Sequence, residues 1–170
     1  METKDFEKAL PKVLKRIGLK ENGWVASMLK EGSPVFIKTP EGFDFKSYLR
    51  DRLEKSGINM VYVDCKMETP YAVFEKVDLA GWHGNVSSVD IERSKTQDSE
   101  KVSSILLIDH FSDLADQRVR MHIESVLKGN RDMNICGKKN IPVILTFSKD
   151  EGMDFFYRND FNIYDERYWK

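Results

Sequence analysis

The chain lacks the residues and runs that mark several large classes of protein. Its only two cysteines, Cys65 and Cys136, lie far apart and in or beside apolar runs, so they indicate buried reduced thiols rather than a disulfide framework. No apolar stretch approaches the roughly 20 residues that a helix needs to cross a bilayer, so no membrane partner is expected. The first residues have no apolar core like that of a secretory signal, and the expected location is the cytoplasm.

An excess of charge of one sign is also missing. Lysine and arginine number 27 and aspartate and glutamate 28, for a net charge of −1, so no overall field draws the chain toward nucleic acid or acidic lipid. The histidines His83, His110 and His122 and the two cysteines show no CxxC or HxxxH spacing, which argues against zinc. A length of 170 residues predicts one domain over residues 1–170.

Four apolar runs of strand length show no alternation between apolar and polar residues. They lie at residues 34–38, 59–64, 104–109 and 141–147. Runs of this kind are typical of strands in a parallel sheet that is covered on both faces. Apolar residues at helical spacing precede or separate them, over residues 3–17, 45–56, 70–78 and 115–127. Alternating strands and helices predict a three-layer α/β fold.

Three further segments are less regular. Residues 1–30 are expected to hold N-terminal helices, with Pro11 producing a kink or dividing the first helix into two, and a second helix around residues 24–29. Residues 87–103 are polar, charged and without periodicity, which predicts a mobile loop. Residues 128–140 form a polar, glycine-containing excursion before the last strand.

Two segments carry a resemblance to a known family. The run Ile-Leu-Leu-Ile-Asp-His at 105–110, the helix after it, the excursion and the strand ending at Ser148 resemble the region from the Walker B strand to the sensor-1 strand of AAA+ ATPases. The likeness is closest to the MoxR-like group, whose Asp-Leu-x-Gly turn resembles residues 78–82. Residues 34–47 look like the first strand and phosphate loop of the same family.

The resemblance covers about residues 24–150 and implies a specific sheet. A P-loop NTPase fold of the AAA+ type places the strand at 141–147 between the strands at 34–38 and 104–109, all of them parallel. The helical lid that follows the sensor strand in active members has no counterpart, because 22 residues follow Ser148. Arg158 is a candidate for the arginine finger on position alone.

The phosphate loop departs from the pattern that its chemistry needs. In GxxxxGK[ST] the glycines let backbone N–H groups turn onto phosphate oxygens, the lysine reaches the outer phosphates and the hydroxyl holds Mg²⁺. Lys46 and Ser47 match the end of this motif, but Pro40 and Phe45 stand where the glycines belong. With Asp44 adding negative charge, residues 43–45 are expected to fill or close the phosphate site.

The hydrolytic positions are altered too. Asp109 matches the aspartate that supports Mg²⁺, whereas His110 replaces the glutamate that polarises water. A histidine has a pKa near neutrality and is a candidate base, and Ser148 stands near the sensor position. Together, the resemblance and these departures from it imply a catalytically inactive ATPase-like domain without a cofactor. The alternative is a divergent ATPase that binds ATP and Mg²⁺ with Lys46, Ser47, Asp109 and His110.

An inactive domain of this kind is expected to act as a binding or regulatory module on a macromolecular machine. By analogy with the family, that machine is the DNA, transcription or replication apparatus or another protein assembly. The expected contact residues are the basic cluster Lys128, Arg131, Lys138 and Lys139. Residues 152–170 form an aromatic tail whose side chains, from Phe155 to Trp169, pack either on their own domain or on a partner.

Overall fold

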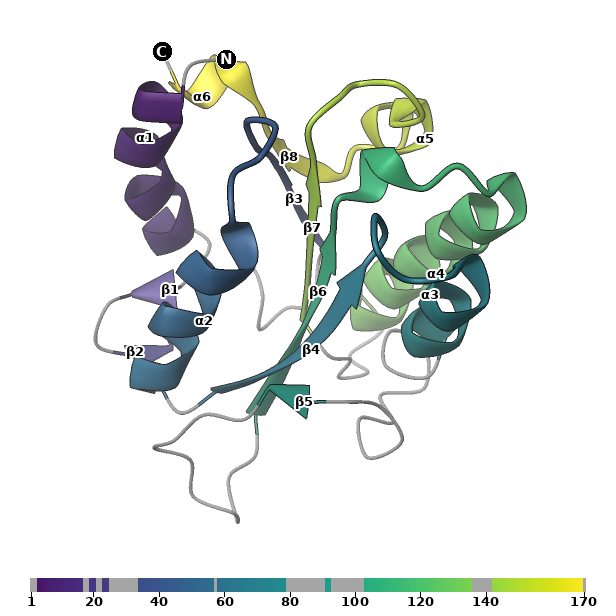
Figure 1. Ribbon diagram of the computed structural model, residues 1–170, viewed down its shortest axis with the longest axis horizontal. Helices are drawn as coiled ribbons and strands as arrows, with labels where there is room; N and C mark the ends of the chain where they lie inside the picture. The colour runs from purple at the N-terminus through teal and green to yellow at the C-terminus, as the bar shows by residue number, and fades with distance from the viewer. Residues whose placement is uncertain are drawn as a thin grey trace.

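The protein is described by a computed structural model over residues 3–16, 19–20, 23–24, 34–56, 58–78, 91–92, 103–135 and 142–169. Its centre is a six-stranded sheet (Figure 1). The strands are β3 (Val35–Lys38), β4 (Ile58–Asp64), β5 (Ile91–Glu92), β6 (Ser103–Asp109), β7 (Val143–Phe147) and β8 (Asn162–Tyr164). A small antiparallel hairpin, β1 (Leu19–Lys20) and β2 (Gly23–Trp24), lies outside this sheet.

The strand order is β5-β4-β6-β7-β3-β8. All neighbours pair in parallel except β5, which is antiparallel to β4. Strand β7 lies between β3 and β6, the position that the resemblance implied. The fold class is therefore confirmed as α/β with a parallel sheet covered by helices.

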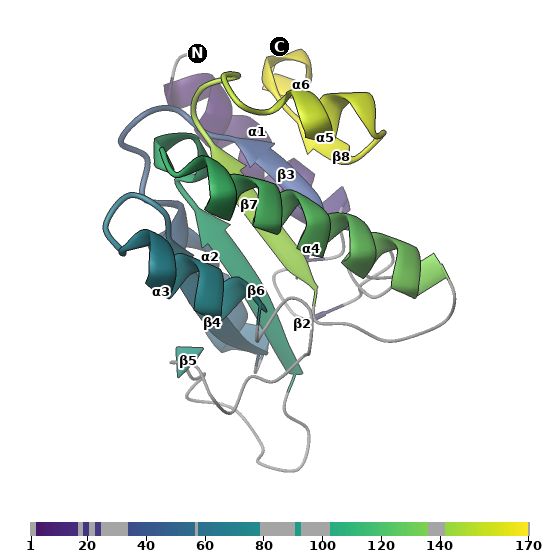
Figure 2. The same cartoon turned by 90° about the vertical axis from the view of Figure 1, so that its right-hand side faces the viewer.

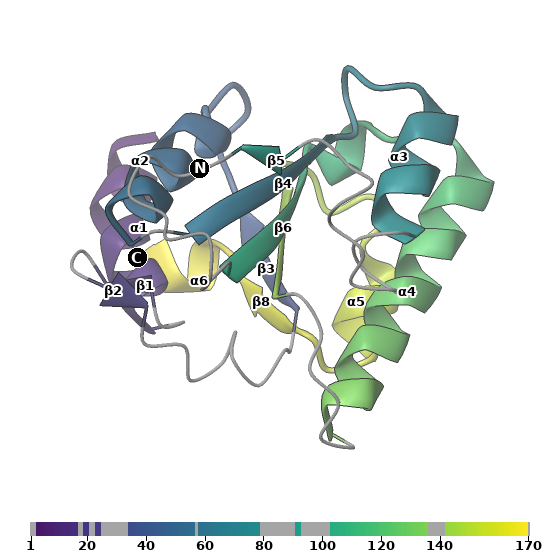
Figure 3. The ribbon, with the colours of Figure 1, turned by 90° about the horizontal axis from the view of Figure 1, so that it is seen from below.

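Helices cover both faces of the sheet. They are α1 (Thr3–Arg16), α2 (Phe45–Ser56), α3 (Pro70–Val77), α4 (Gln117–Ile135), α5 (Asp154–Arg158) and α6 (Glu166–Trp169), with a 3₁₀ turn, η3 (Phe111–Asp113), after β6. Helix α4 crosses one face with α3 beside it (Figure 2). Helices α1 and α2 lie on the opposite side of the sheet (Figure 3).

The side chains on the two faces of the central strands pack into two separate hydrophobic cores. Phe36, Leu106 and Leu145 belong to the core under α3, α4 and α5. Ile37, Leu107 and Ile144 belong to the core under α1 and α2. Because alternate residues of every central strand are buried on opposite sides, the strands are apolar without alternation.

The aromatic tail packs on its own domain. Strand β8 pairs with β3 as an edge strand, and Trp169 of α6 meets the ring of Phe6 in α1 edge-on, with ring centroids 5.1 Å apart. The Lys38 ammonium at the end of β3 binds Glu166 at 2.5 Å and Asp150 at 3.1 Å. Of the two arrangements left open by the sequence, self-packing is confirmed.

Two predicted boundaries need correction. Helix α4 continues to Ile135, so the first part of the expected excursion at 128–140 is helical, and residues 136–140 lie outside the described part. Gly129 lies inside this helix, where a glycine costs about 1 kcal/mol relative to alanine. Tertiary contacts of the following turn offset this cost. Arg131 donates to the carbonyl of Asn159 and lies over the ring of Phe161, which fixes the helix to the tail.

The N-terminal segment also differs from the prediction. Helix α1 runs through Pro11 as one element, because Phe6, Leu10 and Leu14 are buried along one face of both halves. Trp24 belongs to β2 rather than to a helix, and residues 25–29 lie outside the described part. Within the expected loop at 87–103, residues 91–92 pair with β4 and residue 103 begins β6, while the rest is not described.

Candidate functional site

The carboxyl edge of the parallel sheet brings together polar side chains from three adjacent strands. Asp64 at the end of β4 is the register partner of Asp109 at the end of β6. Thr146, near the end of β7, binds the Asp109 carboxylate with its hydroxyl. In open α/β sheets this edge is where ligands bind, because the loops that follow the strands meet there.

Asp109 is held inside the protein by three donors. Its Oδ2 accepts from the Tyr62 hydroxyl at 2.8 Å, and its Oδ1 accepts from the Thr146 hydroxyl and from the backbone N–H of His110, the latter at 3.2 Å. The side chain is almost fully buried, with 3% of its surface exposed. Because both oxygens already serve as acceptors, the carboxylate is a structural anchor of the edge in this arrangement.

Tyr62 and Thr146 were missed as members of this site. Burial and the neighbouring Asp109 carboxylate raise the pKa of Tyr62, so its hydroxyl stays protonated and donates. The sequence signal was a hydroxyl side chain inside each of two otherwise apolar strands. Such a residue in a buried strand needs a partner, but its partner lies on another strand and depends on the register.

His110 turns the chain out of β6 in a left-handed conformation, with φ 58° and ψ 41°. This conformation is uncommon for a residue with a side chain, and histidine is among the types that adopt it more often. The His110 Nδ1 lies 3.0 Å from Oδ1 of Asp64 and 3.7 Å from Oδ2 of Asp109. The ring is therefore oriented by a carboxylate, as the imidazole of a general base would be.

The loop between β3 and α2 contains a carboxylate that binds the start of α2. The Asp44 carboxylate accepts from the backbone N–H of Ser47 at 3.2 Å and from its hydroxyl at 2.7 Å. These bonds cap the N-terminus of α2 and lower the pKa of Asp44. A helix N-terminus after a strand is where a P-loop protein binds phosphate, so Asp44 occupies that position with a carboxylate of the chain itself.

Phenylalanines fix the same loop to the core. Phe45 at the start of α2 is buried, and Phe43 meets the ring of Phe6 edge-on, with centroids 4.8 Å apart. Gly42, with φ +84°, provides the one turn that places Phe43 there. In a P-loop, glycines let several backbone N–H groups face a phosphate, whereas here Phe43 and Phe45 pack into the core that also contains Phe6.

Tyr62 stands between the two residues that would flank a nucleotide's phosphates. The Lys46 ammonium lies over its ring, 4.2 Å from the centroid, and its hydroxyl binds Asp109. In a P-loop site the space between the loop lysine and this aspartate holds the phosphates and Mg²⁺. The side chains present do not fit that group, because Tyr62 and the Asp44 carboxylate take up its contacts.

A site for a metal ion would need several carboxylate, imidazole or thiol side chains close together. Within the part of the chain that the structure describes, no group of three or more His, Cys, Asp or Glu side chains is arranged to hold a metal ion. Cys65, which follows β4, is buried, and burial raises the pKa of its thiol. A thiol in this state is a poor nucleophile.

The other described residues expected at the site are bonded to other groups or exposed to solvent. Ser148 bonds to Ser112 after β6, with the two hydroxyls 3.2 Å apart. Arg158 is exposed on α5. Of the basic cluster, Lys128 is exposed on α4 while Arg131 is engaged by the tail, and residues 138–139 lie outside the described part.

No model of a known protein family matches the chain, and no curated protein matches it. None of the described helices is both long and apolar enough to cross a membrane.

Proposed function

We propose that this protein is an ATPase-like domain of the AAA+ type that does not hydrolyse ATP and works as a binding or regulatory module on a macromolecular assembly. The observation that carries the proposal is the Asp44 carboxylate, bound to the backbone N–H and the hydroxyl of Ser47 at the N-terminus of α2. The parallel order of β6, β7 and β3 supports the likeness in fold.

A phosphate at this position meets two obstacles. It must displace Asp44 from the helix N-terminus or lie next to it. Two unit charges of like sign 4 Å apart repel by about 1 kcal/mol in water and about 4 kcal/mol near a protein surface. The phosphate must also displace the Tyr62 ring from between Lys46 and Asp109, which breaks the hydrogen bond to a buried carboxylate.

The test is a thermal-shift titration of the wild type with ATP and ADP, each with and without Mg²⁺, together with a phosphate-release assay. A nucleotide at 100 times its Kd would stabilise the protein by about 2.7 kcal/mol, so binding would be evident. We expect no stabilisation and no phosphate release. Hydrolysis that disappears in Asp109→Asn or in Lys46→Ala would overturn the proposal.

Asp44→Ser is the matched variant, because serine keeps a helix cap but removes the charge. If the carboxylate is the main obstacle, this variant gains a stabilisation by nucleotide that the wild type lacks. Asp51→Ser, at an exposed position of α2, is the control for loss of one negative charge near the loop.

A second candidate is a divergent ATPase that uses Lys46, Ser47, Asp109 and His110. It is favoured by one observation: His110 is paired with Asp64 at 3.0 Å, at the strand end where attacking water would be activated. Nucleotide-dependent stabilisation together with phosphate release that falls in Asp64→Asn would select this candidate. Stabilisation without phosphate release would indicate an inactive nucleotide-binding regulator.

A further inference from the structure

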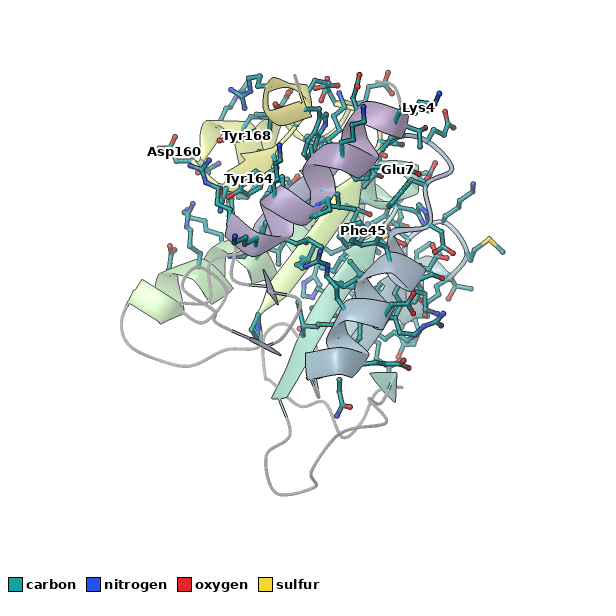
Figure 4. All side chains as sticks on the ribbon, turned by 90° about the vertical axis from the view of Figure 1, so that its left-hand side faces the viewer. Lys4, Glu7, Phe45, Asp160, Tyr164 and Tyr168 are labelled. Carbon is teal, nitrogen blue, oxygen red and sulfur yellow. The ribbon has the colours of Figure 1, made fainter. Side chains whose placement is uncertain are left out.

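We propose that the solvent face of α1 binds the phosphate backbone of a nucleic acid. The inference rests on the proposed function, since it names the partner of the binding module. Lys4, Lys8, Lys12 and Lys15 recur every three or four residues and are exposed, so they form one stripe, here called the lysine stripe. The helix lies in front of the sheet in Figure 4, with Lys4 at its N-terminal end and Glu7 on the flank near Phe45.

The described part of the protein does not neutralise the lysine stripe. Among the described residues, none of its four ammonium groups takes part in an ion pair or a hydrogen bond. Helix α1 carries five basic and two acidic side chains, whereas the whole chain has a net charge of −1, so the other residues together carry −4. Helix α1 thus carries a net positive charge, whereas the remaining residues taken together are acidic.

The spacing fits a row of phosphates. Residues four apart on a helix are separated by about 6 Å along its axis, and Lys4 and Lys15 by about 16 Å. Duplex DNA carries one charge per roughly 1.7 Å of axis, so a segment of this length offers about ten. Lysine acts on phosphate as a flexible point charge and does not need the fixed geometry of an arginine fork.

Other partners fit the lysine stripe less well. Protein interfaces are depleted in lysine at their centre and are anchored by apolar side chains. The large apolar side chains exposed in the described part lie on or next to other helices, and only Tyr168 of α6 is near α1, beside Arg16. A membrane-surface helix inserts an apolar face, but that of α1 (Phe6, Leu10, Val13 and Leu14) is buried against the sheet.

The test measures binding of the full chain to labelled 20-nucleotide single strands and 20-base-pair duplexes of DNA and RNA, from 50 to 200 mM salt. Four phosphate contacts give a slope of log K against log salt of about −3 for single strands and about −3.6 for duplexes. Affinity is expected to fall about 50- to 150-fold over this range. The stripe variant Lys4→Gln, Lys8→Gln, Lys12→Gln, Lys15→Gln should lose most of the binding and of the slope.

Two further variants keep the result interpretable. Replacing the same four lysines by arginine retains the charge and should retain the affinity. The control Lys66→Gln, Arg118→Gln, Lys149→Gln, Arg158→Gln removes four exposed positive charges elsewhere and should bind within about threefold of the wild type. All variants are first checked for a wild-type melting temperature, which exposed substitutions between good helix formers should preserve.

The inference is overturned if the wild type binds none of the nucleic acids at 50 mM salt, or if the stripe variant binds as tightly as the control. Equal or tighter binding to polyglutamate, or to vesicles containing phosphatidylserine, would also overturn it, since the surface would then not select a nucleic acid. Phosphate release measured on the same preparations tests the proposed function separately. A protein that hydrolyses ATP refutes that function whatever it binds.

Discussion

Replacing Asp109 by asparagine tests whether this carboxylate is a structural anchor. Hydrogen bonds to a charged group contribute about 1.5–3 kcal/mol each, against about 1 kcal/mol for neutral pairs. Asp109 accepts three, from Tyr62, Thr146 and the backbone of His110. Asparagine keeps one acceptor oxygen and can donate to the Tyr62 oxygen, so the bonds are weakened rather than lost. We expect Asp109→Asn to lower the free energy of unfolding by about 2 kcal/mol.

Two companion variants locate the loss within the same network. Tyr62→Phe and Thr146→Val each remove one donor to the charged carboxylate and should cost about 1.5–3 kcal/mol. The pair Tyr62→Phe with Asp109→Asn should cost less than the sum of the single changes, because both changes act on the same bond. The expected coupling is about 1 kcal/mol. Tyr62→Phe with Ser112→Ala is the control pair, since Ser112 bonds to Ser148 instead, and it should be additive within about 0.5 kcal/mol.

Urea denaturation followed by circular dichroism at pH 7 measures these differences, with a common slope against urea as the check for two-state behaviour. Asp109→Asn as stable as the wild type would refute the anchoring role. Additivity of the Tyr62 and Asp109 changes would show that the contact between them contributes nothing to stability.

Two further predictions concern the tail and the buried tyrosine. Trp169→Ala should lower the free energy of unfolding by about 3–5 kcal/mol, because the Trp169 ring is buried against Phe6. Tyr168→Ala, at an exposed position, is the control in thermal melts, and an equal loss in both variants would contradict this prediction. Burial raises the pKa of Tyr62. Above about pH 10 the unfolded chain therefore releases this proton while the folded protein keeps it. The free energy of unfolding should then fall by up to about 1.4 kcal/mol per pH unit. In urea melts from pH 9 to 11.5, Tyr62→Phe should show a shallower fall than the wild type, and an equal fall in both would count against a raised pKa.

The sheet was predictable because its signal is local. Each central strand is a continuous apolar run, and its length alone separates it from a helix. The parallel pairing followed from the alternation of these runs with helices, and the place of β7 between β3 and β6 followed from the resemblance alone. The tail strand β8 was not predicted, because its three residues, between Phe161 and Asp165, are too few to carry a strand signal of their own. It forms because the edge of β3 is open to it.

The ends of elements depended on contacts far away in the sequence. Residues 128–135 read as a polar excursion, yet they continue α4 because Arg131 reaches the carbonyl of Asn159 and the ring of Phe161. From the sequence, Arg131 was predicted to contact a partner as part of a basic cluster. No neighbouring residue distinguished that role from a contact within the protein.

Asp109 was identified from its position at a strand end, but its surroundings were not. Its donors come from two neighbouring strands, so they appear only once the register is fixed. Asp44 was recognised as a negative charge in the loop that resembles a phosphate loop. Its bond to the Ser47 backbone could not be foreseen, because it depends on the exact residue at which α2 begins. Sequence patterns thus indicated residues of the candidate site, and the register determined which of their atoms meet.

The carboxyl edge of a parallel sheet gathers polar groups that need partners, whether a ligand or the protein supplies them. In this chain the N-terminus of α2 is capped by Asp44, and the Asp109 carboxylate is satisfied by Tyr62 and Thr146. An edge satisfied in this way does not need a nucleotide to be stable, so the fold can persist without nucleotide chemistry. A function that does not use this edge needs groups elsewhere on the surface, and the lysine stripe of α1 offers four exposed charges that no described residue pairs.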